Sequence, residues 1–282
     1  MEKTDKREPE FVEALARGLA VIESFDAAHS DMTLSEVARR TGMTPAAARR
    51  SLHTLAGLGY VRHVNKKFML SARILTLGSA YLRAARVDEV LLPALTRIVR
   101  QFGDAASVTV LHGLDILYVA HYSEQRAGRM VAGFGVTYPA YATSMGRVLL
   151  GGLSAEDLDT YFGRASFKPL TELTVTDPAL LRERIAEARI QGYATAVDEL
   201  DYGITALAVP IKDGAGRVVA ALNSSGYTGR LKIAEMIVER LSALREAAAL
   251  LSAALRQYPS LSYSLAGSGV NKLPASSWKP AD

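Results

Sequence analysis

The sequence predicts an α+β protein with a small, mainly helical N-terminal part and a larger part built on a largely antiparallel sheet. Up to about residue 102, apolar residues recur mostly every three or four positions, which is the period of an α-helix. From residue 107 onward, β-like runs separated by turn residues alternate with capped helices. The length of 282 residues also favours about two domains.

The first helix is predicted from Phe11 to Phe25, where apolar residues at a spacing of three to four form a stripe that we expect to be buried. The members of this stripe are Phe11, Leu15, Leu19, Ile22 and Phe25. His29 to Asp31 is interpreted as a loop.

Two further helices follow. Thr33 and Glu36 have the spacing of a capping box at the start of the second helix, which is expected to end at Gly42. Thr44 and Pro45 indicate the start of the third, whose inner stripe is Ala48, Leu52 and Leu55.

A hairpin completes this part of the chain. It is predicted from the runs Tyr60–Val64 and Phe68–Leu70 around the basic tip Asn65-Lys66-Lys67. The order of capped helix, glycine turn, capped helix and hairpin predicts a winged helix-turn-helix within residues 1–70. Ser71 is expected to cap a linker helix over residues 71–86.

Charge is concentrated in this region. Residues 32–85 carry nine basic side chains and one acidic, whereas residues 86–282 carry twenty of each. A basic island in an otherwise neutral chain indicates a local site for a polyanion, although a solvated charged face is the plain alternative. Together with the helix-turn-helix pattern, the charge favours double-stranded DNA as the partner.

The third helix is the candidate for reading the major groove. Arginine can bind guanine through two hydrogen bonds, and alanine allows close approach and contact with a thymine methyl. We expect base contacts from its outer face and phosphate contacts from flanking cations, two of them on the wing. The base-contact candidates are Thr44, Ala46, Ala47, Arg49, Arg50 and His53, and the phosphate-contact candidates are Arg39, Arg40, Lys66 and Lys67.

The second part is expected over residues 87–257. Its predicted elements are a helix over 87–102, strands over 107–111, 116–122, 130–136, 193–197, 204–211 and 218–224, helices starting near Thr143, Ser154 and Asp177, and a long helix over 232–257. After Pro259 the chain is rich in Ser, Gly, Ala and Pro, which predicts a flexible tail over residues 258–282.

Several segments resemble IclR-type transcription regulators. Leu15–Phe25, Thr33–Gly42 and Leu52–Tyr60 resemble the DNA-binding domain, and Leu75–Leu82 resembles the linker helix. Pro139–Leu150, Gly203–Ile211 and Ala221–Gly226 resemble the effector domain. The form PAYATSMGRVLL is similar to the branch that regulates aromatic-acid catabolism, including protocatechuate, 4-hydroxybenzoate and β-ketoadipate regulators.

The resemblance implies a GAF-like effector domain, a homodimer or homotetramer, a palindromic operator and a small organic acid as effector. It places the effector at the backbone N–H groups of Ser144 and Met145, and a helix N-terminus is in any case a suitable anion site. Ser225 and Asn223 match family positions that face the ligand, and Tyr141 lines the pocket or packs in the core. Both activators and repressors occur in such a family.

Two departures from the family pattern concern the pocket. Ala196 stands where some members have an aspartate, and Ala206 stands where a cysteine occurs. Both residues are smaller and less polar, which indicates a roomier pocket for an aromatic or longer acid rather than glyoxylate or pyruvate. Asp198, two residues along, is a candidate to replace the lost carboxylate because alternate strand residues share a face.

The chain has no cysteine and its five histidines lack metal-site spacing, so neither a metal nor a cofactor is predicted. His112 and His121 could meet across a hairpin, but a structural or pocket-lining role is favoured over metal binding. Arg126, Arg129 and Arg147 are surface charges or counter-ions to an effector carboxylate. No signal peptide or membrane span is evident, so a cytoplasmic location is expected. The alternative function is an enzyme acting on a small carboxylic acid with an appended nucleic-acid-binding domain, and no nucleophile–base motif supports it.

Overall fold

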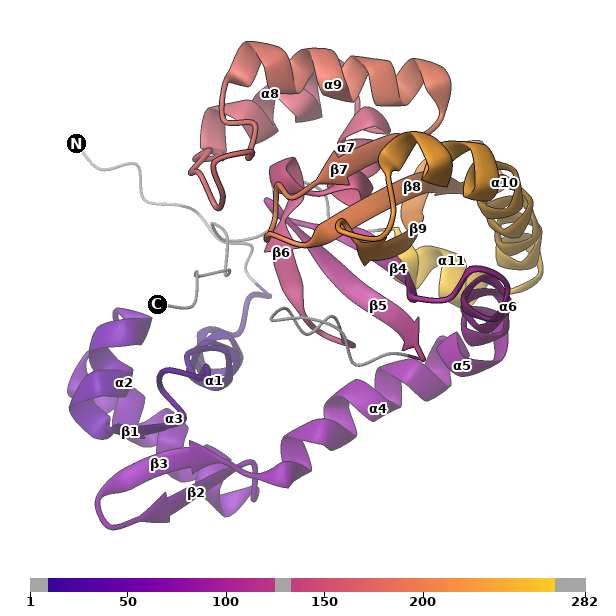
Figure 1. The fold of residues 1–282 in the computed structure, drawn as a ribbon. Helices are drawn as coiled ribbons and strands as arrows, with labels where there is room; N and C mark the ends of the chain where they lie inside the picture. Colours follow the sequence, from indigo (N-terminus) through magenta and orange to yellow (C-terminus); the bar gives the residue numbers. More distant parts are fainter. Residues whose placement is uncertain (1–9, 125–132, 267–282) are drawn as a thin grey trace. The chain divides into compact units, whose positions relative to one another are not determined.

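The helices of the N-terminal part begin where the sequence supplies side-chain caps. A computed structural model of the chain describes residues 10–124 and 133–266 and contains helices α1 (Glu13–Glu23), α2 (Leu34–Thr41) and α3 (Pro45–Gly57) (Figure 1). The Thr33 backbone N–H donates to the Glu36 carboxylate at 2.7 Å, and the Glu36 N–H donates back to the Thr33 hydroxyl. The capping box is therefore confirmed, as are the Thr44 cap and the left-handed Gly42.

A three-stranded antiparallel sheet forms the wing. Its strands are β1 (Asp31–Thr33), β2 (Val61–Val64) and β3 (Lys67–Leu70), in the order β1-β3-β2. Asn65 and Lys66 both have positive φ, which makes a two-residue type I′ turn, one residue shorter than predicted. β1 lies partly in the segment interpreted as a loop, and it exists because Met32 pairs with the distant Phe68.

The core of this part differs from the prediction at the first helix. The inner stripe of α3 is buried as expected, together with Val37, Val61 and Phe68. Phe11, Leu15 and Leu19, however, are 48%, 64% and 47% exposed, so this half of the predicted buried stripe faces outward. Val21 is the residue of α1 that is fully buried.

The chain divides into two units between Tyr81 and Leu82, inside the segment predicted to be a linker. This segment contains a 3₁₀ turn at Ala72–Ile74, capped by the Ser71 hydroxyl, followed by α4 (Leu75–Ala84). The single helix expected over 87–102 is instead two, α5 (Val87–Val90) and α6 (Leu92–Phe102). Pro93 explains the break, because proline cannot donate the backbone hydrogen bond that a continuous helix requires.

The second unit is built on a six-stranded sheet in the order β6-β5-β4-β9-β8-β7, with every neighbouring pair antiparallel. The strands are β4 (Ala105–His112), β5 (Asp115–Ser123), β6 (Thr137–Pro139), β7 (Ala194–Val197), β8 (Ile204–Lys212) and β9 (Val218–Tyr227). The predicted largely antiparallel sheet is therefore confirmed.

The strand predicted over residues 130–136 is not confirmed. Its first three residues lie outside the described residues, and Gly133 to Val136 form no strand. Gly135 has a φ of 82°, which turns the chain, and β6 begins only at Thr137.

Helices cover both faces of this sheet (Figure 1). On one face lies α7 (Ser144–Gly151), with α8 (Ala155–Arg164) and α9 (Pro178–Gln191) beyond it. On the other face lie α6 and the long α10 (Ile233–Gln257).

Helix α11 (Pro259–Leu265) occupies part of the segment predicted to be a flexible tail, so that prediction is wrong for these residues. Leu261 and Leu265 are buried, and this burial of apolar side chains stabilises a helix that composition alone does not indicate. Residues 267–282 lie outside the described residues.

Helix α7 is seated by an unusually close backbone approach. A Cβ atom at position 146 would overlap the carbonyl group of Ala140, which precedes the helix. The residue at this position therefore has to be glycine for the chain before α7 to fold back against the helix.

Replacing this glycine tests the constraint. We expect Gly146→Ala to destabilise the second unit by about 3 kcal/mol, because the added methyl forces the helix away from Ala140. Urea unfolding followed by circular dichroism measures the change. Gly163→Ala in α8, where a Cβ meets no atom within 4 Å, is the matched control and should leave the stability unchanged or slightly raised. Equal effects of the two substitutions would contradict the explanation.

Candidate nucleic-acid interface and ligand pocket

The outer face of α3 presents most of the predicted base-contacting residues. Thr44, Ala46, Arg49, Arg50 and His53 are all exposed. Ala47 is buried, so its prediction as a base contact is wrong in this structure. It lies eight residues, or about two helical turns, before the buried Leu55, which places it on the buried edge of the helix.

The predicted phosphate contacts divide into two groups. Arg39 and Lys66 are exposed, and Lys67 forms an exposed ion pair with Asp31 at 3.0 Å, of a kind that contributes little energy and leaves the ammonium available. Arg40 instead donates to the Ser24 carbonyl at 2.9 Å and to Asp26 at 2.6 Å. Its guanidinium connects α1 to α2, so its predicted role as a phosphate contact is replaced by a structural one.

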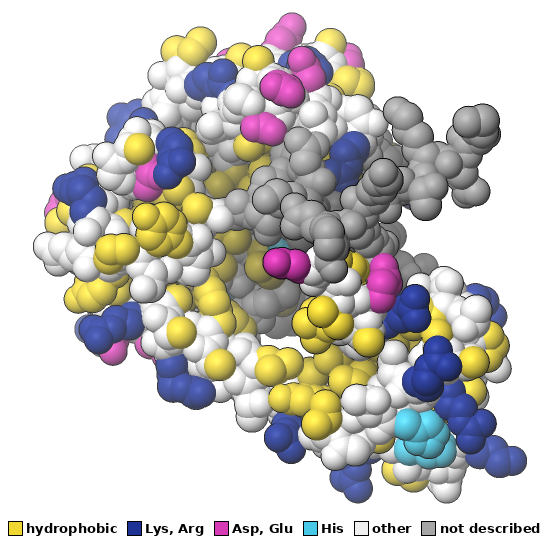
Figure 2. Space-filling view, turned by 180° about the vertical axis from the view of Figure 1, so that it is seen from behind, with side chains coloured by type: hydrophobic (Ala, Val, Ile, Leu, Met, Phe, Trp, Pro, Cys, Tyr) yellow, Lys and Arg dark blue, Asp and Glu magenta, His cyan; other side chains and the backbone are white. Residues whose placement is uncertain are grey.

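Two residues of the wing add to this surface and were not selected from the sequence. Arg62 on β2 is exposed, and the exposed His63 stacks on Phe68 with ring centroids 4.2 Å apart. The His53 ring of α3 lies edge-on to the same pair, which joins α3 to the wing. Figure 2 shows lysine and arginine side chains gathered around a histidine on this unit.

The second candidate site begins at the N-terminus of α7. The Thr143 hydroxyl caps the helix by accepting the Gly146 N–H at 2.9 Å. The N–H groups of Ser144 and Met145 belong to the first turn, where no earlier helical carbonyl can accept them, and the helix dipole favours an anion there. The Ser144 hydroxyl is 1% exposed and has no hydrogen-bond partner in the part of the chain that the structure describes.

The face of the sheet beneath α7 supplies the other wall. Ala221 of β9 packs in the same core as Met145, and alternate residues of the strand share this face, so Asn223 and Ser225 lie on it as well. The Thr109 hydroxyl contacts the Met145 sulfur at 3.3 Å, which places the start of α7 over β4 and β9. The structure therefore brings Ser144, Met145, Asn223 and Ser225 to one region.

Asn223 is the strongest sign that this region holds a polar ligand. Its side chain is 3% exposed, and its Oδ1 atom has no hydrogen-bond partner within the described ranges. A buried polar atom without a partner is costly, because it has lost its hydration without replacement. Asn223 and Ser144 approach the same region from different elements, which is what a site completed by a ligand requires.

The two alanines predicted to enlarge the pocket face each other. Ala196 of β7 is directly opposite Ala206 of β8, and Ala206 is directly opposite Ser225 of β9. Four methyl or hydroxymethyl side chains thus line one row across the sheet, since Ala105 pairs with Ser225 on its other side.

Two other sequence-predicted residues, Asp198 and Tyr141, have structural roles. The alternation argument for Asp198 is wrong, because β7 ends at Val197 and Asp198 has a φ of 55°. Its carboxylate accepts hydrogen bonds from the Gly203 N–H and the Thr228 hydroxyl, which closes the turn between β7 and β8. The Tyr141 hydroxyl is bound to the backbone of Lys168, in a core cluster different from that of Met145.

Neither interpretation of Arg147 fits the structure. It is 4% exposed and forms a bidentate ion pair with Glu199, and it also donates to the Thr195 carbonyl at 2.8 Å. The pair fastens α7 to the chain after β7. Arg126 and Arg129 lie outside the described residues.

Sequence reasoning missed Ser107 and Thr109 in this region, whereas His121, for which it favoured a structural or pocket-lining role, lies beside them. All three lie on the same sheet face, because Ser107 is opposite Asn223, Thr109 is opposite Ala221 and His121 is opposite Ser107. A bulge between Val108 and Thr109 shifts the register of the hairpin, and this shift is not visible in the sequence. His112 pairs with Asp115, so the two histidines do not meet across the hairpin.

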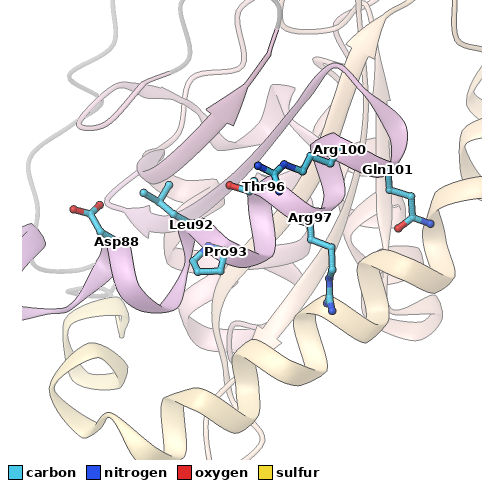
Figure 3. Close-up of a pocket in the computed structure, with 7 residues that line it drawn as sticks. All are labelled: Asp88, Leu92, Pro93, Thr96, Arg97, Arg100 and Gln101. Atoms are coloured by element: carbon cyan, nitrogen blue, oxygen red, sulfur yellow. The ribbon is translucent and has the colours of Figure 1, made fainter.

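A separate hollow of about 680 Å³ lies along α5 and α6 (Figure 3). Its lining residues are Asp88, Leu92, Pro93, Thr96, Arg97, Arg100 and Gln101, none of which the sequence predicted as a site. Within residues 10–124 and 133–266, no group of three or more His, Asp or Glu side chains is placed to hold a metal ion. No helix among these residues is both long and apolar enough to cross a bilayer.

Comparisons with known proteins agree with this geometry. Residues 14–65 match the IclR helix-turn-helix domain, and residues 79–253 match the C-terminal domain of the bacterial transcriptional regulator IclR. The chain is 40% identical over 230 residues to the Pca regulon regulatory protein of Pseudomonas putida, which covers 81% of this chain and 79% of the relative. It is 33% identical over 247 residues to the p-hydroxybenzoate hydroxylase transcriptional activator of Acinetobacter baylyi, with coverage of 86% and 91%.

The solved structure of a homologue has the same fold. An IclR homologue from Microbacterium hydrocarbonoxydans, complexed with 4-hydroxybenzoate, superimposes with a TM-score of 0.72 at 27% identity, covering 86% of this chain and 99% of that one. The proteins named in these comparisons are regulators and not enzymes, and the alternative of an enzyme with an appended nucleic-acid-binding domain is not supported.

The exposed face of α3 leads to a test with duplex DNA. We expect Arg49→Ala to weaken binding to a duplex that the protein selects from a random library. If Arg49 contacts a base, the loss is about 1–3 kcal/mol and concentrated at one base position. Fluorescence anisotropy against the selected duplex and its single-base variants measures it. Arg100→Ala, an exposed arginine of the second unit, removes the same charge and should leave the affinity unchanged. An equal loss for both variants would contradict the interface.

Proposed function

Because the chain belongs to the IclR family of bacterial transcription regulators, we propose that an aromatic acid bound beside α7 controls how its N-terminal unit binds an operator. The observation that carries the ligand site is that Ser144 Oγ and Asn223 Oδ1 are among the buried side-chain atoms that have no hydrogen-bond partner in the described part of the chain. They lie on two elements that meet at a helix N-terminus, which is suited to a carboxylate.

The row of small side chains favours an aromatic acid over a two- or three-carbon keto acid. Ala105, Ala196 and Ala206 flank Ser225 and fill little of the space above the sheet. Met145 adds a flexible apolar surface, which suits the face of a ring. The relatives named for the Pca regulon and for p-hydroxybenzoate hydroxylase, and the homologue with bound 4-hydroxybenzoate, support this choice.

The regulatory step follows from linkage between two sites. An effector that binds one arrangement of the protein better than another shifts the population toward that arrangement, and bound operator then changes the effector affinity by the same factor. The sign of regulation is set by which arrangement binds the operator. A reporter gene assayed with and without the acid distinguishes an activator from a repressor.

We further propose that the protein acts as a homo-oligomer joined in part through its N-terminal unit. Leu15 and Leu19 are spaced by one helical turn on α1, and both are about half exposed or more. On α4, Leu75 is 71% exposed and Leu77 is 47% exposed. Exposed apolar stripes of this kind mark interfaces, and a second copy of the chain supplies a matching stripe.

The effector class is tested by thermal stability. We expect protocatechuate and 4-hydroxybenzoate to raise the melting temperature more than glyoxylate at equal concentration, because the proposed site binds aromatic acids more tightly. A ligand at 100 times its Kd stabilises the folded protein by about 2.7 kcal/mol. The variant Asn223→Leu should lose most of this shift, whereas Leu173→Ala, at an exposed position, should keep it. Stronger stabilisation by glyoxylate would contradict the aromatic assignment.

The oligomer is tested by introducing charge. We expect the double substitution Leu15→Glu and Leu19→Glu to lower the molar mass in light scattering, because carboxylates cannot be buried unpaired between two copies. Ile190→Glu, at an 87% exposed position on α9, is the control and should leave the mass unchanged. An unchanged mass for the double variant would place the interface elsewhere.

A further inference from the structure

A row of four residues crosses the sheet beneath α7 and ends at a histidine. Register pairs Ala208 of β8 with Asn223 of β9, Asn223 with Ser107 of β4, and Ser107 with His121 of β5. Directly opposite residues in antiparallel strands share a face, so His121 lies on the face that carries the proposed effector site.

Ser107 fixes the orientation of the His121 ring. The Ser107 hydroxyl lies 2.9 Å from His121 Nδ1, and Ser107 is 1% exposed. The other ring nitrogen, Nε2, lies on the opposite side of the imidazole and has no hydrogen-bond partner in the described part of the chain. The Tyr118 ring packs edge-on against the imidazole, with centroids 6.5 Å apart, and limits its rotation further.

The imidazole of His121 favours its neutral form. Burial lowers the pKa of His121, because the surrounding protein solvates the imidazolium poorly. A neutral imidazole has one N–H and one unprotonated nitrogen, so Nε2 can donate to or accept from a hydroxyl according to the tautomer. It adds no positive charge, and it is therefore matched to a hydroxyl rather than to a carboxylate.

The two ends of the pocket thus differ in chemistry. The end at α7 offers backbone N–H groups and the positive end of a helix dipole, which suit an anion. The end at β5 offers a neutral, oriented imidazole. Asn223 and His121 stand on strands two spacings apart, about 10 Å between backbones, so a ligand that touches both ends is at least one ring long.

We propose that His121, positioned by Ser107, determines specificity for aromatic acids that carry a ring hydroxyl, through a hydrogen bond between that hydroxyl and Nε2. This inference rests on the proposed function, since it assigns the residue that contacts the ligand at the other end of the same pocket. Benzoate then lacks a partner for Nε2, whereas 3- or 4-hydroxybenzoate supplies one.

The test is calorimetric titration of the full chain with benzoate, 3-hydroxybenzoate and 4-hydroxybenzoate. The wild-type protein is expected to bind one of the two hydroxybenzoates about tenfold more tightly than benzoate, which is the upper range for a single neutral hydrogen bond. His121→Phe keeps a ring against Tyr118 but removes both nitrogens. It is expected to abolish this preference and to leave the benzoate affinity within about twofold.

Two further variants separate recognition from folding. His121→Gln restores a polar group near the place of Nε2 and is expected to recover part of the preference. Ser107→Ala leaves the ring in place but removes its tether, so it is expected to reduce the preference partially even if His121→Phe does not fold. His112→Phe makes the same chemical change at the far end of the hairpin and is expected to behave as wild type.

The outcomes distinguish the two proposals. If the wild-type protein binds none of the three acids, the proposed function fails and the assignment of His121 fails with it. If the wild type prefers a hydroxybenzoate but Ser107→Ala and His121→Phe weaken all three acids equally, His121 has a structural role and only this inference is overturned. An undiminished preference in His121→Phe overturns it as well.

Discussion

The second unit depends on one close approach, that of Gly146 to the carbonyl group of Ala140. This approach lets the segment before α7 fold back against the helix, so that its first turn points along the sheet face instead of into solvent. The Thr143 cap and the contact between Thr109 and Met145 then fix the helix over β4 and β9. The residues of the proposed site on β4 and β9 lie beneath that helix start.

The buried polar side chains of this unit have two kinds of role, one structural and one proposed for ligand binding. Arg147 pairs with Glu199 and donates to the Thr195 carbonyl, which holds the end of β7 against α7, and the Asp198 carboxylate closes the turn between β7 and β8. Ser144 Oγ and Asn223 Oδ1 are buried without hydrogen-bond partners among the described residues. Because a folded protein rarely leaves such atoms unpaired, they support the ligand site proposed beside α7.

The N-terminal unit shows the same division among its cations. Arg40 joins α1 to α2 through its hydrogen bonds, whereas Arg49, Arg50 and Lys66 are exposed. The basic island seen in the sequence is therefore partly structural and partly a binding surface. Local charge identified the surface, but it could not assign the role of each arginine, because that depends on which acidic group lies nearby.

The sequence by itself determined the caps, the order of the elements and the location of the charge, because these depend on residues close together in the chain. Thr33 with Glu36, Thr44 and Gly42 all act within one helical turn, and each was predicted correctly. The resemblance to the family also assigned Ser144, Met145, Asn223 and Ser225 to one site. The sequence did not show which of their side-chain atoms are buried or hydrogen-bonded.

Tertiary structure decided what depends on distant partners. The pairing of β1 with β3, the outward turn of Leu15 and Leu19, and the burial of Leu261 and Leu265 are set by contacts across the fold. The bulge at Val108 and Thr109 fixes the register that brings His121 beside Ser107 and into the row that contains Asn223. Period and propensity describe one segment at a time, whereas register and burial are properties of two or more segments together.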